Sequence, residues 1–400
     1  MNGKLTEGTL RIGLDLVNLT DPGEGLGRFA GQLVRGLASV PSGHEFVLFV
    51  REELAGHFAA LSTRTRLSPV RLPRRRLLPW NQLAFLGNGR LGGLDILHSP
   101  VSVSPLLPGG RGLKRIVTVH DLAFIVSPSA SSAASRAWWN FSWPRSLRGA
   151  AAIVTDSERT KQDVISRYSL REEKISVIYP YVSFANDDVP AGVIRRARHR
   201  YGLPARYILH VGAPHKRKNL VTLIRAFSLL KKNPSVPHAL VLAGPNGWDD
   251  ASLRKEADEA RLGDEVVFTG FVADEDMPGV YAGADVLAFP SLYEGFGYPP
   301  LEAMACGTPV VVSNVSSLPE VVGDAALLVP PGDAGAITGA ILRVLTSPEL
   351  SAKLRQAGRL RVGQFSKERM AREYLDVYEK VAWPRQDGPS PGRDGGGRPS

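Results

Sequence analysis

The chain has 400 residues, of which 43% are hydrophobic and 22% are charged, as in an ordinary soluble globular protein of two or three domains. Its net charge of +10 and pI near 9.8 indicate an anionic partner: a sugar nucleotide, a phospholipid surface or a nucleic acid. The single cysteine, Cys306, excludes an internal disulfide framework and fits a reducing compartment.

Targeting and membrane signals are absent from the sequence. No stretch reaches the about 20 apolar residues that a membrane-spanning helix needs, and the N-terminus has no apolar signal-peptide core. We therefore expect a cytoplasmic protein, which contacts the inner face of the membrane if a basic surface binds anionic lipid.

The first predicted strand, residues 10–17, leads into a glycine loop and then a helix that starts near Arg28. Gly25 and Gly27 stand in this loop, where backbone N–H groups at a helix start can hold a diphosphate. Glycine also serves any tight turn, but the position between first strand and first helix favours an anion site. No GxGxxG followed by a ribose-binding acid is present, which disfavours a dinucleotide dehydrogenase.

A basic stretch, Arg64 to Arg76, follows the second predicted strand. Six arginines lie there, followed by two leucines and Trp80. Basic residues beside apolar ones suit an anionic membrane surface or a phosphorylated lipid acceptor. A solvated basic face is the other interpretation.

His120 comes at the carboxyl end of a short predicted strand, residues 115–119, where ligands bind in open α/β sheets. A lone histidine at such a place is a structural residue or a site residue, and spacing does not decide between them. Strands and helices alternate up to residue 178, which predicts a parallel sheet covered by helices.

The loop at residues 179–192 is the predicted domain boundary, and a second strand–helix series follows it. Arg217 and Lys218 stand directly before the first helix of this series. Cations at a helix start oppose the helix dipole, so this arrangement indicates a bound anion such as a diphosphate. A solvated basic turn is the alternative.

Asp274, Glu275 and Asp276 resemble a metal-binding D-x-D triplet. They precede a predicted helix, however, and acidic residues are common in a first helical turn. We expect no metal there.

The most informative stretch follows a buried apolar strand at residues 284–289. Glu294 lies in a glycine-rich loop, and Glu302 lies early in the helix that comes after it. Ionised carboxylates only accept hydrogen bonds, so two of them on one wall suit a ligand rich in hydroxyl groups. Glycine N–H groups and a helix start favour phosphate, and together these features describe a sugar-nucleotide site. A solvated loop glutamate and an ordinary first-turn helix glutamate are the alternative.

The string EGFGYPPLEAMACGTPVV, which contains both glutamates, resembles the signature of the retaining glycosyltransferases of family 4. The resemblance covers about residues 10–381 and is more specific in the C-terminal half. The segments GLGRF and HDLAF are similar to the mannosyltransferase branch. Near Arg217 the family pattern is interrupted at Ala213, His215 and Lys216.

This resemblance implies an α/β protein of the GT-B fold, with two Rossmann-like doubly wound domains that face a central cleft. Residues 1–185 would form the acceptor-side domain, and residues 190–366 the nucleotide-sugar-binding domain. A helix at about 367–382 would pack back on the first domain, and the glycine- and proline-rich tail, 384–400, would be disordered.

The resemblance also implies residue roles. Glu294 and His120 would contact the donor sugar as catalytic residues, and Glu302 would hold the ribose hydroxyls. Arg217 and Lys218 would bind the diphosphate. The other implied donor-binding residues are Gly25, Gly27, Val272 (near the nucleobase), Phe296 and Gly297.

The implied activity is retaining, metal-independent transfer of a sugar to a hydroxyl group of a saccharide or lipid-linked acceptor. The donor would be GDP-mannose or a UDP-sugar, and no cofactor is implied. Two alternatives stay open: a sugar-nucleotide epimerase of the same fold, and a non-catalytic basic protein that binds nucleic acid. A complete donor signature without a nucleic-acid motif disfavours the second, so we expect no nucleic-acid partner.

Overall fold

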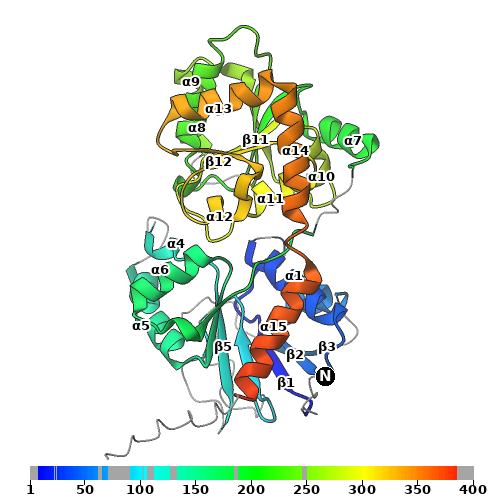
Figure 1. The fold of residues 1–400 in the computed structure, drawn as a ribbon, viewed down its shortest axis with the longest axis vertical. Helices are drawn as coiled ribbons and strands as arrows, with labels where there is room; N and C mark the ends of the chain where they lie inside the picture. Colours follow the sequence, from blue (N-terminus) through cyan, green and yellow to red (C-terminus); the bar gives the residue numbers. More distant parts are fainter. Residues whose placement is uncertain are drawn as a thin grey trace, which may run out of the picture.

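The computed structural model describes residues 8–21, 23, 25–61, 65–70, 91–101, 103–105, 112–126, 133–183, 188–245 and 250–384. Two parallel sheets flanked by helices form two domains, stacked one above the other in Figure 1. This arrangement confirms the predicted α/β architecture of two Rossmann-like domains.

The first sheet has seven strands in the order β3-β2-β1-β4-β5-β6-β7, and all its neighbours are parallel. Its strands are β1 (Arg11–Asp15), β2 (Glu45–Arg51), β3 (Thr65–Val70), β4 (Ile96–Ser99), β5 (Lys114–Val119), β6 (Ala152–Thr155) and β7 (Ile175–Val177). The strand order reverses between β1 and β4, which is the place where such sheets bind ligands.

The second sheet has six parallel strands in the order β10-β9-β8-β11-β12-β13. They are β8 (Tyr207–Val211), β9 (Ala239–Ala243), β10 (Val266–Gly270), β11 (Val286–Phe289), β12 (Val310–Ser313) and β13 (Leu327–Val329). Here the order reverses between β8 and β11.

The helices of the N-terminal domain are α1 (Gly25–Ser39), α2 (Ala55–Ala59), α4 (Ala123–Val126), α5 (Ala133–Gly149) and α6 (Glu158–Tyr168). Those of the C-terminal domain are α7 (Ala191–Tyr201), α8 (Leu220–Leu230), α9 (Asp250–Glu259), α10 (Met277–Ala282), α11 (Tyr298–Ala305), α12 (Leu318–Val322), α13 (Ala334–Thr346) and α14 (Pro348–Val362). The last helix, α15 (Lys367–Ala382), follows α14.

Burial on both faces explains the apolar strands. Every residue of β11 and β12 is buried, because helices cover both sides of a parallel sheet. The C-terminal domain therefore has two apolar clusters, one on each face of its sheet.

The chain passes between the domains twice, once before α7 and once between α14 and α15 (Figure 1). After the second passage α15 packs against α1 of the N-terminal domain, and its Tyr374 and Tyr378 are fully buried there. The Tyr378 hydroxyl lies 2.8 Å from Nδ1 of His98. Burial lowers the pKa of His98 to about 3, so this histidine is a neutral core residue.

Two sequence expectations differ from the structure or fall outside it. Helix α1 begins at Gly25 and not near Arg28, so the predicted loop glycines lie in its first turn. Within the basic stretch, residues 65–70 form β3 at the edge of the first sheet. Arg64, residues 71–76 and the tail from residue 385 lie outside the described residues.

A helix that crosses a membrane must be both long and apolar. Among the helices of the described ranges, none combines the length and the apolar character that crossing a membrane requires.

Candidate active site

The carboxyl ends of the two sheets meet at the domain boundary. Gly295 follows β11, His120 follows β5, and an ideal Cβ at Gly295 would lie 1.9 Å from the carbonyl oxygen of His120. Only glycine permits so close an approach of two backbones. The loop that carries Glu294 is therefore seated directly on the N-terminal domain.

Glu294 is buried, and two cations of its own domain balance its negative charge. Its Oε2 accepts a hydrogen bond of 2.7 Å from Arg217, and its Oε1 accepts one of 2.6 Å from Lys218. Burial alone would raise the pKa of this carboxyl, but the two cations outweigh it and lower the pKa to about 2. Glu294 is thus ionised at neutral pH and acts only as an acceptor.

The cations come from a short 3₁₀ turn, Lys216–Lys218, between β8 and α8. Lys218 is buried, and desolvation lowers its pKa although Glu294 opposes the shift. Asn219 ends the turn in the left-handed conformation, and its side-chain amide donates to the carbonyls of Pro290 and Pro331. The turn is thereby tied to the loop that follows β11.

A cation of the other domain balances the negative charge of Glu302. This residue of α11 is buried, and its Oε1 forms an ion pair with Arg28 of α1. Its Oε2 accepts a hydrogen bond of 2.7 Å from the hydroxyl of Tyr281, in α10. The carboxylate that the family resemblance assigns to the ribose therefore holds the two domains together in this structure.

His120 has both ring nitrogens against acceptors. Nδ1 lies 2.6 Å from Oδ2 of Asp156, and Nε2 lies 2.6 Å from the carbonyl oxygen of Pro100. Each ring nitrogen needs its own proton to donate to its acceptor, so the doubly protonated imidazolium form satisfies both contacts best. Burial lowers the pKa of His120, but the Asp156 carboxylate, the Pro100 carbonyl and Asp121 together outweigh burial, and the net shift is upward.

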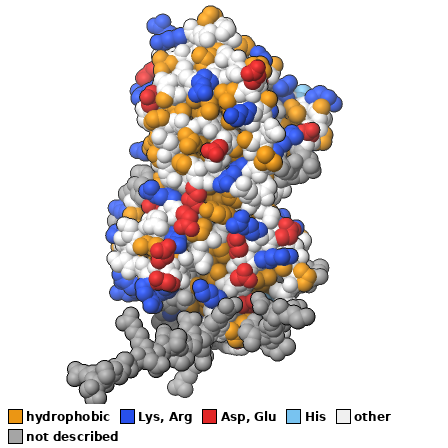
Figure 2. All heavy atoms as spheres, viewed as in Figure 1, with side chains coloured by type: hydrophobic (Ala, Val, Ile, Leu, Met, Phe, Trp, Pro, Cys, Tyr) orange, Lys and Arg blue, Asp and Glu red, His pale blue; other side chains and the backbone are white. Residues whose placement is uncertain are grey.

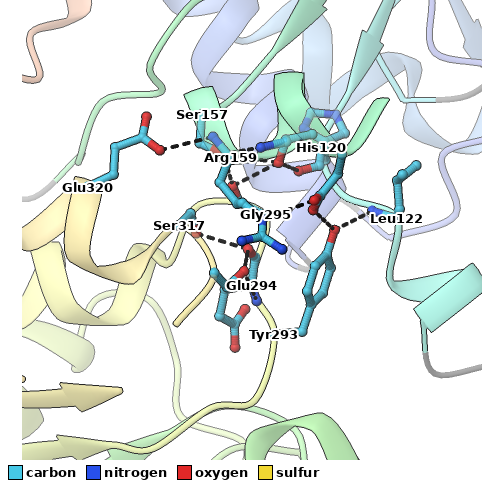
Figure 3. A network of polar contacts seen from close by, with 12 residues as sticks. His120, Leu122, Ser157, Arg159, Tyr293, Glu294, Gly295, Ser317 and Glu320 are labelled. Carbon is cyan, nitrogen blue, oxygen red and sulfur yellow. Dashed lines mark hydrogen bonds and ion pairs between the residues drawn. The ribbon is translucent and has the colours of Figure 1, made fainter. Parts of the chain in front are cut away.

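The first turn of α6 fixes the contact between Gly295 and His120. The hydroxyls of Ser157 and Thr160 lie 2.7 and 3.2 Å from the carbonyl oxygen of Gly295 (Figure 3). The neighbouring Tyr293 reaches across as well, because its hydroxyl accepts the backbone N–H of Leu122. Side-chain hydroxyls of the N-terminal domain thus hold the loop at Gly295, and a backbone N–H of that domain holds it at Tyr293, on the other side of Glu294.

The remaining predicted residues lie around this centre. Gly297 caps α11 with a φ of +104°, a conformation that favours glycine. The side chains of Phe296 and Val272 are buried in the core of the C-terminal domain. Gly25 and Gly27 stand in the first turn of α1, whose N–H groups have no partner within the helix.

A small pocket opens beside the Lys218 turn, at the ends of three neighbouring strands. It is lined by Gly212, Pro214, Leu220, Leu242, Gly244, Pro245, Leu253, Phe268 and Gly270. An ideal Cβ at Gly244 would lie 2.4 Å from the carbonyl oxygen of Gly212. The pocket is therefore shaped by the close approach of two loops, with backbone groups on its wall.

The D-x-D triplet does not resemble a metal site in the structure. Asp276 is fully buried and forms ion pairs with Arg196 and Arg200, each at 2.8 Å. The hydrogen bond from Arg196 is the main reason why the pKa of Asp276 is lowered. Across the described ranges, no three His, Cys, Asp or Glu side chains gather as metal ligands would.

The net charge is distributed broadly. On the face shown in Figure 2, Lys and Arg side chains are spread over both domains and mixed with Asp and Glu. The cations with a defined ionic partner in the site are therefore more informative than the total charge.

Several residues of this centre were not predicted as site residues from the sequence. They are Arg28 (although it stands in the GLGRF segment), Asp156, Ser157, Thr160 and Tyr281. Asp156 and Ser157 follow β6, the neighbour of β5. Since parallel strands present their carboxyl ends at one edge, strand order alone would have placed these two beside His120.

Two family models match the chain. The model described as "Glycosyltransferase Family 4" matches residues 23–185, and the one described as "Glycosyl transferases group 1" matches residues 195–361. The matches correspond to the two domains of the structure.

Individual proteins show the same similarity. The chain is 30% identical to O-antigen chain mannosyltransferase B of Escherichia coli, over 90% of this chain and 96% of that protein. Its fold is similar to that of sucrose-phosphate synthase from Thermosynechococcus elongatus, with a TM-score of 0.74, 27% identity and coverage of 93% and 99%. HepE of Anabaena, solved with UDP and glucose, has the same TM-score at 18% identity, with coverage of 93% and 100%.

Proposed function

This chain belongs to the glycosyltransferases of family 4, with the GT-B fold, and on that premise we propose that it transfers mannose with retention of the anomeric configuration. The donor is nucleotide-linked, and the acceptor is a hydroxyl group of a saccharide or lipid-linked saccharide. The similarity to a mannosyltransferase supports the sugar. GDP-mannose is the donor that we propose first, and UDP-sugars come second because a protein of the same fold was solved with UDP.

One observation carries this proposal: buried Glu294 pairs with buried Lys218 and with partly exposed Arg217 beside the start of α11. Burying a carboxylate with its cations carries a desolvation penalty, so a buried ion cluster is weak evidence for stability alone and is a candidate for a functional site. A donor diphosphate would take the cations and free the carboxylate to accept hydrogen bonds from sugar hydroxyls. The same three charges thus suit both halves of a nucleotide sugar.

The charges also constrain the chemistry. With a pKa of about 2, Glu294 has no proton to donate to a leaving group at neutral pH. In a front-face reaction the acceptor oxygen bonds to C1 of the sugar on the face where the C1–O bond to phosphate breaks. The hydroxyl proton passes to the leaving phosphate oxygen, and Arg217 and Lys218 stabilise the charge on the diphosphate.

His120 contributes a positive charge near the sugar in this proposal. Its ring binds Pro100 and Asp156, so it contacts a donor hydroxyl by exchanging the Pro100 carbonyl for the ligand. At the other end of the donor, the glycine-lined pocket near Gly244 and the backbone at Val272 are the proposed binding place of the nucleobase. We propose no metal and no cofactor.

A panel of nucleotide sugars tests the proposal directly. Binding and slow donor hydrolysis would be measured for wild type, Glu294→Ala and the control Glu349→Ala, which changes an exposed glutamate in the first turn of α14. We expect selective binding of GDP-mannose, and hydrolysis that is lost only in Glu294→Ala. A chelator should leave wild-type hydrolysis unchanged.

The other outcomes identify the rivals. Conversion of the donor to an epimer without an acceptor would show an epimerase. Failure to bind any donor, with salt-dependent binding to nucleic acid, would show a nucleic-acid-binding protein. Co-sedimentation with anionic but not neutral vesicles would support membrane contact through the stretch from Arg64 to Arg76, and equal partition would exclude it.

A further inference from the structure

The short helix α12 contacts both the Glu294 loop and the N-terminal domain. At its start, Oγ of Ser317 lies 2.9 Å from the carbonyl oxygens of Glu294 and Phe296. Residues three apart lie on one side of a helix, so Glu320 extends from the same side as Ser317. In Figure 3 the Glu320 side chain points across the boundary toward the start of α6.

Glu320 caps α6 from the opposite domain. Its carboxylate accepts the backbone N–H of Glu158 at 2.7 Å and that of Arg159 at 3.1 Å. These are the first two N–H groups of α6, which have no acceptor within the helix. The hydroxyl of Tyr179, in the segment between the domains, donates to the same carboxylate at 2.8 Å.

Glu320 is also fixed in its own domain. Arg361 of α14 binds the carbonyl oxygen of Glu320, and its Nε donates to the carbonyl oxygen of Val321 at 2.8 Å. The cap is therefore anchored at both ends and does not depend on the position of one mobile side chain alone.

The first turn of α6, which Glu320 caps, also holds the loop that carries Glu294. Thr160 lies 3.2 Å from the carbonyl oxygen of Gly295 and 3.3 Å from that of His120. Ser157 contacts the same Gly295 oxygen and also begins the helix as its N-cap. A shift of this turn would move the backbone of His120 relative to that of Glu294.

We propose that Glu320 is a positioning residue for sugar transfer, which acts by capping α6 across the domain boundary. The inference rests on the proposed function, because it assigns Glu320 a part in the same reaction. The donor contacts proposed for Arg217, Lys218 and Glu294 all lie in the C-terminal domain. Those three contacts do not depend on α6, whereas the proposed contact of His120 with a donor hydroxyl does. Donor affinity should therefore depend only weakly on Glu320, whereas the transfer rate should depend on it strongly.

Hydrogen exchange tests the cap without any substrate. In donor-free protein, mass spectrometry of peptides that span residues 153–165 should show protected amides in wild type and faster exchange in Glu320→Ala. Asp333→Ala is the matched control, because Asp333 caps α13 within its own domain through the N–H of Ala336. It should not change exchange in α6. Unchanged exchange in Glu320→Ala would overturn the proposal.

Kinetics test the consequence. Glu320→Ala should lower kcat roughly 10- to 100-fold, as small misplacements of reacting groups do, while the donor Kd changes less than about twofold. Glu320→Gln keeps one acceptor oxygen and should recover part of both kcat and protection. A parallel loss of donor affinity would overturn the positioning role.

Two further results are decisive as well. If Glu320→Ala does not fold, Glu320→Gln and Tyr179→Phe carry the same tests, each with partial loss of the cap. If wild type uses no nucleotide sugar, the proposed function fails, and the exchange experiment alone decides whether Glu320 caps α6.

Discussion

Glu294, in the loop after β11, and Glu302, in α11, are both buried, but the positive charges that pair with them come from different places. Glu294 is bound by Arg217 and Lys218, which follow β8 in the same domain. Glu302 is bound by Arg28, which comes from the other domain, and by Tyr281. Glu294 thus keeps its cationic partners whatever the position of the domains, whereas Glu302 has its cationic partner only when the domains are in contact.

This difference separates two tasks of the cleft. The Glu294 cluster is complete within the C-terminal domain, so it can be preorganised for a donor before the cleft closes. The pair of Glu302 and Arg28 adds a Coulombic attraction between the domains, and a ligand that takes either partner changes that attraction. Removing one cation from each side should therefore have different consequences.

The largest effect is expected for Lys218→Met. This change leaves Glu294 buried with Arg217 alone, and we expect a loss of about 3 kcal/mol in the free energy of unfolding, near the lower limit for a broken buried pair. Denaturant unfolding measures it. The pKa of Glu294 should rise, so the stability that this carboxylate gives above about pH 4.5 should be lost at a higher pH than in wild type.

Lys216→Met is the matched control for that change. Lys216 lies two residues away in the same turn with its side chain exposed. Its substitution should alter stability by no more than about 0.5 kcal/mol. Equal losses in the two variants would contradict a specific role of the buried Lys218 charge.

Arg28→Met should have a smaller effect of another kind. Glu302 would keep Tyr281 but lose its cation. Because Arg28 is partly exposed, we expect a cost of about 2 kcal/mol, as for a charged hydrogen bond, at the contact between the domains. Small-angle scattering should show a larger radius of gyration than in wild type. Arg35→Met, on the exposed side of α1, should leave it unchanged. An unchanged radius in Arg28→Met would mean that other contacts suffice to hold the domains.

The stability that the pair of His120 and Asp156 contributes should depend on pH. Because Asp156 raises the pKa of His120, the pair stabilises the fold fully below about pH 6.5 and loses this contribution as pH rises through the raised pKa. Asp156→Asn should therefore cost about 1.5 kcal/mol at pH 5.5 and less at pH 9. Thermal unfolding across this range measures the difference, with Asp258→Asn, which changes an exposed residue of α9, as control. A gap that widens with pH would refute the imidazolium assignment.

Local sequence predicted the parts of the site that are close together in the chain. The strand, glycine loop and helix around Glu294 were predicted from an apolar run, glycines and first-turn prolines, and β11 and α11 are found there. The α/β fold was predicted from alternating strands and helices and is confirmed. The roles given to Glu294, Glu302 and His120 stay predictions.

Contacts between distant residues could not be predicted in this way. Arg28 and Glu302 are 274 residues apart, and Arg217 and Glu294 are 77 apart. The first pair depends on how the two domains are oriented, and the second depends on β8 and β11 being neighbours in one sheet. Hydrophobic periodicity encodes neither. The sequence indicated an anion near Arg217 and Lys218, and in the structure Glu294 fills that role. A cationic turn thus implies a negative partner without telling whether it is a ligand or the protein itself.

The smallest effect is expected for Tyr281→Phe, which tests whether Glu302 depends more on its charge partner or on its neutral one. The change removes the hydroxyl that donates to Oε2 at 2.7 Å and leaves the ion pair with Arg28 intact. We expect a loss of about 1 kcal/mol in unfolding free energy, since a carboxylate that keeps its cation loses only part of its stabilisation. The radius of gyration should stay as in wild type, in contrast to Arg28→Met. If Tyr281→Phe instead separated the domains, the hydroxyl would be what orients Glu302 toward Arg28, and cross-domain attraction would depend on a residue of the C-terminal domain.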